Sequence, residues 1–250
     1  MSDIERWRTL LGRTTVLWAR PEGFSETDTG WLAFSGYQSV EFNIAFCQAT
    51  SAGGAAVRQA VDTVLEARVP SLLILAGPAL GDAQVLADAS WICIDSLPLM
   101  AFDDPARHEI DPAVRRLSKD DLPAVHALIT ESFAYTADLA AVAVPEAAFE
   151  TEGQSVWGLF DGDELVSCRA TVRSGDTSGG WSLATPPRLQ GRGYGGRILR
   201  GVLGREASEG VTLWLSWCTP AGRRATMSVG YREVERWQVW SRPRWVLKRS

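Results

Sequence analysis

One stretch of the chain decides its fold: residues 183–196 read LATPPRLQGRGYGG. Its apolar start is typical of a strand, and the two prolines prevent that strand from continuing. Four glycines within six residues then lead into a helix that we predict over residues 194–209. Glycines let consecutive N–H groups turn inward without a Cβ clash, and at a helix N-terminus such groups form a concave anion site. The stretch therefore predicts a phosphate-binding loop between a strand and a helix.

Two well-known phosphate motifs do not fit this loop. Gly191, Gly193 and Gly196 match G-x-G-x-x-G, but the dinucleotide fingerprint follows its strand immediately and needs an acidic residue at the end of the next strand. Here residues 186–188 intervene, and residues 217–219 read WCT, without an acid. The P-loop is excluded because the chain contains no Gly-Lys-Ser/Thr.

The loop instead resembles that of the GNAT family of N-acetyltransferases. Gln190-x-x-Gly193-x-Gly195 is similar to the family's Q/R-x-x-G-x-G/A motif, and residues 229–234 (VGYREV) stand in place of its l-G-F-x-x-v. The resemblance covers residues 156–240 and, more loosely, residues 114–133. It implies an α/β (α+β) fold with a mixed, mostly antiparallel sheet flanked by helices. It also implies acetyl-CoA as co-substrate and no metal.

The resemblance assigns particular residues to the cofactor. The loop amides would hold the pyrophosphate, the backbone N–H of Thr185 would polarise the thioester carbonyl, and Thr219 stands where the family often has an Asn that contacts pantetheine. The residues that it assigns to acetyl-CoA are Leu183, Ala184, Thr185, Gln190, Gly191, Arg192, Gly193, Tyr194, Gly195 and Thr219. A fixed donor at the carbonyl is worth about 3–4 kcal/mol in enzymes from which such donors have been removed.

The reaction implied is the transfer of an acetyl group to an amine of a small molecule or peptide, by direct attack in a ternary complex. Holding amine and thioester together would supply much of the rate. No covalent intermediate is needed, which agrees with the absence of a G-x-S-x-G nucleophile motif.

The chain departs from the family at the general acid. The family's Tyr lies four residues before the Gly of G-F, and Thr226 stands there. A threonine hydroxyl is a far weaker proton donor than a phenol. Glu131 is a candidate to relay a proton from the ammonium through water, with a solvated helix-end carboxylate as the alternative interpretation. Two other functions therefore stay open: a catalytically weak or inactive acyl-CoA-binding protein, and a partner-binding scaffold.

The chain also shows an internal echo. Ala60-Val61 precede Ile198-Leu199 by 138 residues, and Leu73 precedes Leu213 by 140. Such an offset predicts two related tandem units: a degenerate GNAT-like domain at 1–108 and an acetyltransferase domain at 113–250. A polar, proline-bounded linker at 103–112 would join them. Residues 50–55 (TSAGGA) stand where the motif stands in the second unit but lack its Gln/Arg, so we expect one working cofactor site.

Charge limits the partners of the chain. The formal net charge of −5 argues against a nucleic-acid partner. It hides a division, because residues 188–250 carry 13 Lys+Arg against 4 Asp+Glu, whereas residues 1–187 carry 12 against 26. The basic part begins at the loop and suits a polyanionic cofactor.

The remaining composition bears on metals, compartment and assembly. Four cysteines lie far apart, which disfavours a metal or redox site. We expect a cytoplasmic protein without a membrane partner, because no signal peptide is visible and no apolar run approaches the about 18–20 residues that span a bilayer. Eleven tryptophans are open to three interpretations: core packing, an apolar acceptor pocket, or a face that joins subunits into a homodimer.

Overall fold

The computed structural model describes residues 3–104 and 110–246. The chain divides into two compact units: Met1–Leu99 with Glu233–Ser250 form unit 1, and Met100–Arg232 form unit 2. Strands β5 (Ile92–Phe102) and β11 (Arg232–Ser241) each cross this division. The domains predicted at 1–108 and 113–250 are continuous ranges of sequence, whereas unit 1 combines the two ends of the chain. The common origin of the two predicted domains stays a prediction. The linker predicted at 103–112 lies partly outside the described residues.

Unit 1 is a sheet covered by short helices. Its strand order is β1-β2-β3-β4-β11-β5, in which β3 and β4 pair in parallel and the pairs β1–β2, β2–β3 and β4–β11 are antiparallel. The strands not yet given are β1 (Phe24–Thr27), β2 (Gly30–Phe34), β3 (Asn43–Cys47) and β4 (Leu72–Leu75). The helices are α1 (Asp3–Arg13), α2 (Ala55–Ala67), α3 (Ala83–Asp88) and α8 (Pro243–Val246). Helix α2 buries its apolar face in the core that β3 and β4 form.

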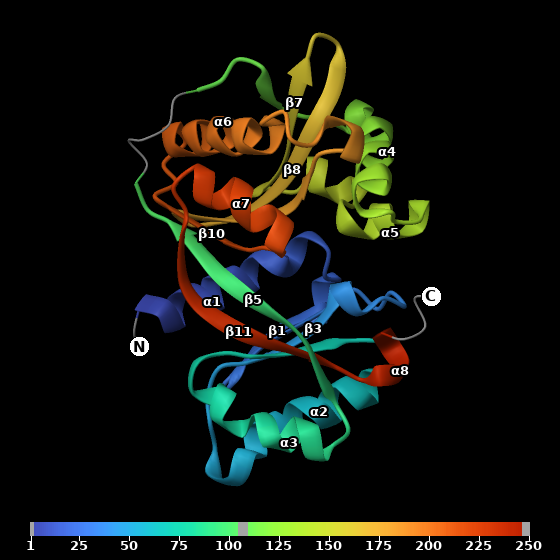
Figure 1. Ribbon diagram of the computed structural model, residues 1–250, viewed down its shortest axis with the longest axis vertical. Coiled ribbons are helices and arrows are strands. Elements are labelled where there is room, and N and C mark those ends of the chain that lie inside the picture. The colour runs from blue at the N-terminus through green and yellow to red at the C-terminus, as the bar shows by residue number, and fades with distance from the viewer. Residues whose placement is uncertain (1–2, 105–109, 247–250) are drawn as a thin grey trace. The chain divides into compact units, whose positions relative to one another are not determined.

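Unit 2 holds the motif-bearing segment. Its strand order is β10-β9-β8-β7-β6, in which only β10 and β9 pair in parallel. The strands are β6 (Val114–Arg116), β7 (Gln154–Asp161), β8 (Glu164–Ser174), β9 (Thr177–Ala184) and β10 (Leu213–Trp217). The helices are α4 (Leu122–Phe133), α5 (Ala137–Ala143), α6 (Tyr194–Ser208) and α7 (Pro220–Ser228). Helices α6 and α4 lie on the two sides of β7 and β8 (Figure 1). The expected mixed, mostly antiparallel α+β sheet flanked by helices is confirmed.

The first helix is shorter than its apolar spacing predicts. The apolar residues Trp7, Leu10, Leu11, Val16, Leu17 and Trp18 predict one helix over residues 5–20. In the structure α1 ends at Arg13 and a 3-10 turn follows at Thr14–Leu17. The hydroxyls of Thr14 and Thr15 donate to the carbonyls of Leu11 and Gly12, both at 2.7 Å. Such bonds compete with the helix ladder and end it, so the prediction is wrong for the second half of that segment.

A buried carboxyl anchors α6 to β10. The side chain of Glu206 is buried and accepts a hydrogen bond from Trp214 Nε1 at 2.8 Å. Burial raises the pKa of Glu206 above its ordinary value of 4.5, although hydrogen bonds from its neighbours and the charge of Arg169 act in the opposite direction. Burial therefore shifts the balance between the two forms of the Glu206 carboxyl toward the neutral form in the folded chain.

We expect Glu206→Gln to flatten the pH dependence of stability. Because the folded pKa is raised, the folded chain holds a proton that the unfolded chain releases. The stabilisation from the neutral carboxyl is thus complete below about pH 4.5 and is lost as pH rises toward the folded pKa, at about 1.4 kcal/mol per pKa unit. The glutamine oxygen still accepts from Trp214. Urea unfolding between about pH 4.5 and 8 measures the effect, and an unchanged pH slope in the variant would contradict it.

Candidate functional site

The loop before α6 presents open backbone to solvent. Gly191 and Gly193 have φ of +78° and +84°, a region that side chains rarely adopt. A Cβ at either position would meet no atom within 4 Å among residues 3–104 and 110–246, so none of these residues covers the loop there. The first N–H groups of a helix have no partner within it and lie at the positive end of its dipole. The loop therefore has the open backbone that an anion site needs, and its role as a phosphate-binding loop stays a prediction.

Side-chain hydrogen bonds hold this loop in place. Gln190 Nε2 donates to the carbonyl of Thr185 at 3.0 Å, which closes the loop on itself. Ser167 on β8 donates to the carbonyl of Ala184 at 2.7 Å and also contacts the hydroxyl of Thr185 at 2.9 Å. The side chain of Gln190, assigned above to the cofactor, thus braces the loop from within. Ser167 fixes the end of β9, a role that a serine inside a strand does not signal in the sequence.

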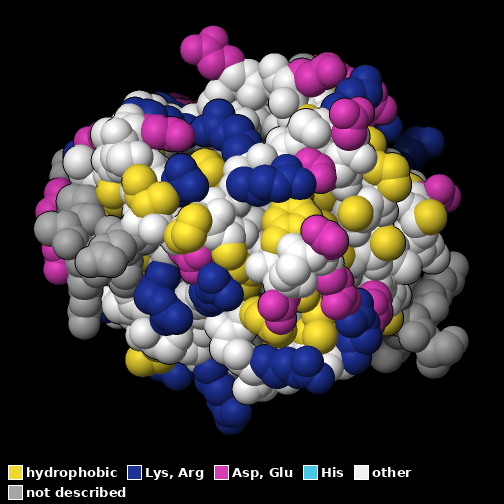
Figure 2. Space-filling view, turned by 90° about the horizontal axis from the view of Figure 1, so that it is seen from above, with side chains coloured by type: hydrophobic (Ala, Val, Ile, Leu, Met, Phe, Trp, Pro, Cys, Tyr) yellow, Lys and Arg dark blue, Asp and Glu magenta, His cyan; other side chains and the backbone are white. Residues whose placement is uncertain are grey.

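Carboxylates neutralise part of the basic charge near the loop. Arg188 pairs with Glu164 at 2.7 Å and with Glu131 at 3.3 Å, and Arg197 pairs with Asp111 at 2.6 Å. The hydrogen bond from Arg197 lowers the pKa of Asp111. Figure 2 shows the same mixture, with Lys/Arg and Asp/Glu side chains side by side over one face of the molecule. Glu131, the candidate proton relay, is exposed and faces Arg188.

Two polar side chains, Arg192 and Tyr194, lie where the loop meets α6. Arg192 is exposed on the loop itself, beside the two open glycines. The hydroxyl of Tyr194 donates to Asp161 at the end of β7, and this bond raises the pKa of Tyr194. Tyr194 thereby ties the start of α6 to the β7–β8 turn.

The strands β9 and β10 part as they approach the loop. Their backbone pairing runs from Thr177–Leu213 to Gly179–Leu215 and, in the described residues, goes no further. At the next position Ser216 Oγ donates to the carbonyl of Gly180 at 3.2 Å, so a side chain takes over from the backbone ladder. The edge of β9 beyond Gly180 is thus without a backbone partner on β10.

A β-bulge bends β9 at the same place. Cys168 and Ala170 on β8 pair with Ala184 and Trp181 on β9, so β9 carries one extra residue between them. Ser182 has φ of +50°, and its hydroxyl donates to the carbonyl of Ala143 at the end of α5. Bulges re-aim a strand and are common next to active sites. Nothing in the sequence marks Ser182 for this role, because a non-glycine residue at positive φ has no local signature.

The two threonines near α7 are engaged in that helix. Thr219 caps α7, accepting from the N–H of Gly222 at 3.4 Å. Thr226 is buried, and its hydroxyl donates to the carbonyl of Arg223 at 3.0 Å. The sulfur of Cys218 lies 3.8 Å from the Thr226 oxygen. The Thr226 proton is therefore directed back into its own helix.

The glycine loop of unit 1, at residues 50–55, is closed. Gly53 and Gly54 also have positive φ, but the N–H of Ala56 donates to Ser51 Oγ at 2.6 Å. A Cβ on Gly54 would lie 3.5 Å from the Asp82 carboxylate. A hydroxyl and a carboxylate thus stand at the N-terminus of α2, where a phosphate would need to approach. This arrangement agrees with the expectation of one working site.

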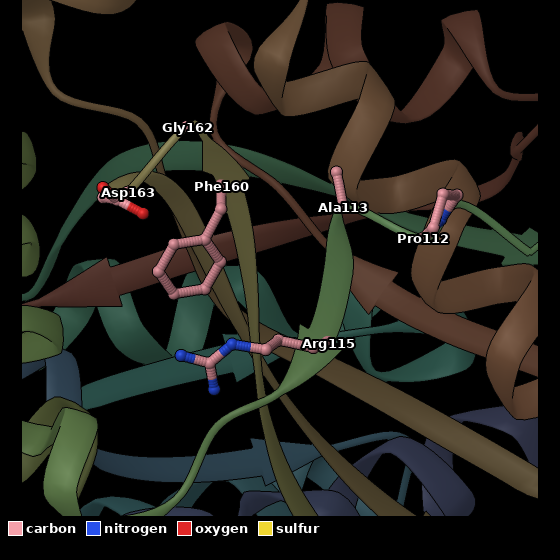
Figure 3. Close-up of a pocket in the computed structure, with 6 residues that line it drawn as sticks. All are labelled: Pro112, Ala113, Arg115, Phe160, Gly162 and Asp163. Carbon is pink, nitrogen blue, oxygen red and sulfur yellow. The ribbon is translucent and has the colours of Figure 1, made fainter.

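Unit 2 also carries a hollow that is separate from the loop. Figure 3 shows its lining residues, among them Arg115, whose guanidinium lies 4.3 Å over the ring of Phe160. The hollow measures about 580 Å³ and is wide open to solvent beside the β7–β8 turn. None of its lining residues belongs to the segment 183–196, so we do not assign it to the loop site.

Residues 3–104 and 110–246 contain no group of three or more His, Cys, Asp or Glu placed to hold a metal ion. His126 Nε2 lies 2.9 Å from the carbonyl of Val144, a contact between α4 and the end of α5. No single helix there has the length and apolarity to cross a membrane. Two helical segments, Lys119–Phe133 and Ala137–Phe149, together have the length and apolar composition of a membrane span, but they are bent by 107° at the break between them.

Comparison with known proteins identifies the fold. No protein-family model and no curated protein matches the sequence. Among solved structures, a GCN5-related N-acetyltransferase from Kribbella flavida matches with a TM-score of 0.62 over 94% of this chain and 96% of that one, at 16% identity. This chain has the fold of the GCN5-related N-acetyltransferases.

Other solved structures agree with this fold. A GCN5-related N-acetyltransferase from Sphaerobacter thermophilus matches with a TM-score of 0.60 over 84% of this chain and 75% of that one, at 12% identity. A functionally unknown conserved protein from Staphylococcus epidermidis matches with a TM-score of 0.60 over 87% and 92%, at 8% identity. The GNAT-like fold expected from the motif is confirmed, whereas the tandem origin with a degenerate first copy stays a prediction.

Proposed function

We propose that this chain is an N-acetyltransferase that transfers the acetyl group of acetyl-CoA to an amine of a small molecule or peptide. One observation carries the proposal: an open glycine loop at the N-terminus of α6 follows a bulged strand whose edge beyond Gly180 is without a backbone partner on β10. The donor set fits the group, because backbone amides suit a pyrophosphate and a free strand edge suits the amides of the pantetheine arm. Acetyl-CoA would supply a thioester carbonyl open to attack by an amine.

Each part of the site has a role under this proposal. The amides of 191–195 and the exposed Arg192 would hold the pyrophosphate, and Leu183 and Ala184 would line the arm. The N–H of Thr185 would polarise the carbonyl as negative charge develops on it. Ser167 keeps that N–H in place, since its hydroxyl bonds both to the Ala184 carbonyl and to the Thr185 side chain.

Thr226 favours a second candidate function, an acyl-CoA-binding protein with little or no turnover. Its buried hydroxyl donates to backbone carbonyls of α7 and is poorly placed to protonate a leaving thiolate. Glu131 is held by Arg188 at the surface, which leaves its role as a relay a prediction. If water supplies the proton, transfer is slow but does not stop.

A thermal-shift panel tests whether the loop binds CoA. Ligand at about 100 times its dissociation constant stabilises the folded chain by about 2.7 kcal/mol. For a chain of this size we expect a rise of roughly 5–10 °C in Tm with CoA or acetyl-CoA. NAD and ATP serve as controls and should give a much smaller shift. No shift with either CoA compound would contradict both candidate functions.

Thiol release then separates the two candidates. An acetyltransferase releases free CoA thiol from acetyl-CoA only when a suitable amine from a panel is added, whereas a binding protein does not. Because acetyl-CoA is a metabolite of the cell interior, the proposal keeps the cytoplasm as the expected compartment and a homodimer as an open expectation. It names no nucleic-acid or membrane partner.

A further inference from the structure

Side chains close the gap between β9 and β10 at the level of Gly180, where the backbone pairing ends. We call this closure the floor of the gap; Arg169 forms it on one face of the sheet, and Trp181 and Trp217 form it on the other. On one face of the sheet, the guanidinium of Arg169 occupies the space over Gly180, where a Cβ would lie 1.8 Å from its Nη2. Arg169 is buried and donates to the hydroxyl of Tyr231 at 3.2 Å. Tyr231 packs with Leu199 and Leu203 of α6, so this closure lies on the α6 face.

Two tryptophans close the opposite face at the same level. Trp181 follows Gly180 on β9, and Trp217 follows Ser216 on β10. Their rings meet edge-on, with centroids 5.3 Å apart and planes at 88°. Successive side chains of a strand point to opposite faces, and Trp214 points to Glu206 on α6, so Trp217 faces away from α6.

Neighbouring contacts show which elements lie on that face. Ser182, in the bulge next to Trp181, donates to the carbonyl of Ala143 on α5. Helix α4 also contacts β8 and β9. Trp181 is buried and Trp217 is half-buried, so the two rings are packed into the protein and are not loose surface side chains. Just beyond it, towards the loop, the edge of β9 is unpaired.

We propose that the Trp181–Trp217 pair limits the acyl donor to short chains, acetyl and propionyl. This inference rests on the proposed function, because it concerns the donor that the loop would hold. An arm anchored by its pyrophosphate at 191–195 would bring its thioester carbonyl to the N–H of Thr185, so an acyl chain longer than acetyl would extend from there along the free edge of β9 toward the level of Gly180. A longer chain would have to displace two interlocked aromatic rings. The pair thus sets donor length, which neither the motif nor the fold specifies.

Binding of an acyl-CoA series to Trp217→Ala tests the inference without relying on turnover. In the wild-type chain, we expect octanoyl-CoA to bind at least tenfold more weakly than acetyl-CoA in calorimetric titration. Trp217→Ala opens the floor, and each methylene that then becomes buried improves affinity by up to about fourfold. The dissociation constant of octanoyl-CoA divided by that of acetyl-CoA should therefore fall from at least ten to one or below. Affinity for CoA itself, which has no acyl group, should stay unchanged.

Two further variants make the result decisive. Trp217→Phe keeps an aromatic ring across the gap and should retain the preference for acetyl-CoA. Trp181→Ala removes the other half of the pair and should relax the preference as well, which covers the case in which Trp217→Ala fails to fold. Equal binding of acetyl- and octanoyl-CoA by the wild-type chain, or an unchanged ratio in a folded alanine variant that still binds CoA, would overturn the inference. A wild-type chain that binds no CoA compound would instead overturn the proposed function.

Discussion

Gly193→Asp should abolish the stabilisation by CoA while leaving the chain folded. The new side chain has to adopt φ near +84°, which is strained for any L-residue, and it places a carboxylate where the phosphates approach. Carboxylates are themselves tolerated at helix N-termini, so the unliganded fold should lose only about 1 kcal/mol to strain. Affinity for CoA should drop by a factor of about 100 or more, which is about 2.7 kcal/mol. Thermal shift and calorimetric titration of the full chain measure the two effects.

The loop of unit 1 offers a matched control for this change. Gly53 also has positive φ and lies just before the start of a helix, with Arg58 Nη2 3.5 Å from where a Cβ would lie. Gly53→Asp carries the same strain and the same charge but should leave the CoA shift intact. If CoA still stabilised Gly193→Asp as it does the wild-type chain, the loop of unit 2 would not be the phosphate site.

Gly180→Ala should be among the most destabilising single substitutions in unit 2. Its Cβ would lie 1.8 Å from Nη2, 2.4 Å from Cζ and 2.6 Å from Nε of Arg169, so the whole guanidinium must move. Arg169 is buried, and moving it breaks its hydrogen bond to Tyr231. Overpacking together with a buried charge that loses its partner costs about 3 kcal/mol or more. Denaturant unfolding of the full chain measures the loss.

A double-mutant cycle assigns this effect to the one contact. In an Arg169→Ala background the side chain that the new Cβ would strike is absent. Gly180→Ala should then cost less than about 1 kcal/mol, which leaves a coupling energy of about 2 kcal/mol or more. Additive losses from the two substitutions would show that Arg169 is not what occupies the space over Gly180.

Local chemistry made much of unit 2 predictable from the sequence. The turn at residues 161–163 needs positive φ, and Gly162 has it at +61°. Ser118 with an acidic residue three positions later predicts a capping box, and the structure has it, with the Ser118 N–H donating to the Asp121 carboxylate at 2.8 Å. The glycine loop is predictable for the same reason, because the residues that shape it are contiguous in the chain.

Features that depend on distant partners were not predictable. Counting arginines near the loop implies a strongly basic site, yet Arg197 pairs with Asp111, 86 residues away in the chain. Likewise Asp82 approaches the N-terminus of α2 from another element of unit 1. Arg169, Ser216 and the bulge at Ser182 lie where β9 and β10 part, and none of these residues has a signature of its own. Only the resemblance to the GNAT family implies that the strand before the loop splays away from its neighbour. Periodicity and turn residues report local structure, whereas these contacts arise only from packing.

Hydrogen–deuterium exchange of the full chain, with and without acetyl-CoA, tests the central claim most directly. The account predicts that acetyl-CoA slows amide exchange in the peptide that covers residues 188–196, because ligand oxygens accept hydrogen bonds from amides that face solvent in the free chain. Exchange in the peptide that covers residues 50–56 should not change, since Ser51 and Asp82 close that loop. Protection at 50–56, or none at 188–196 under saturating acetyl-CoA, would contradict the assignment of the cofactor loop to unit 2.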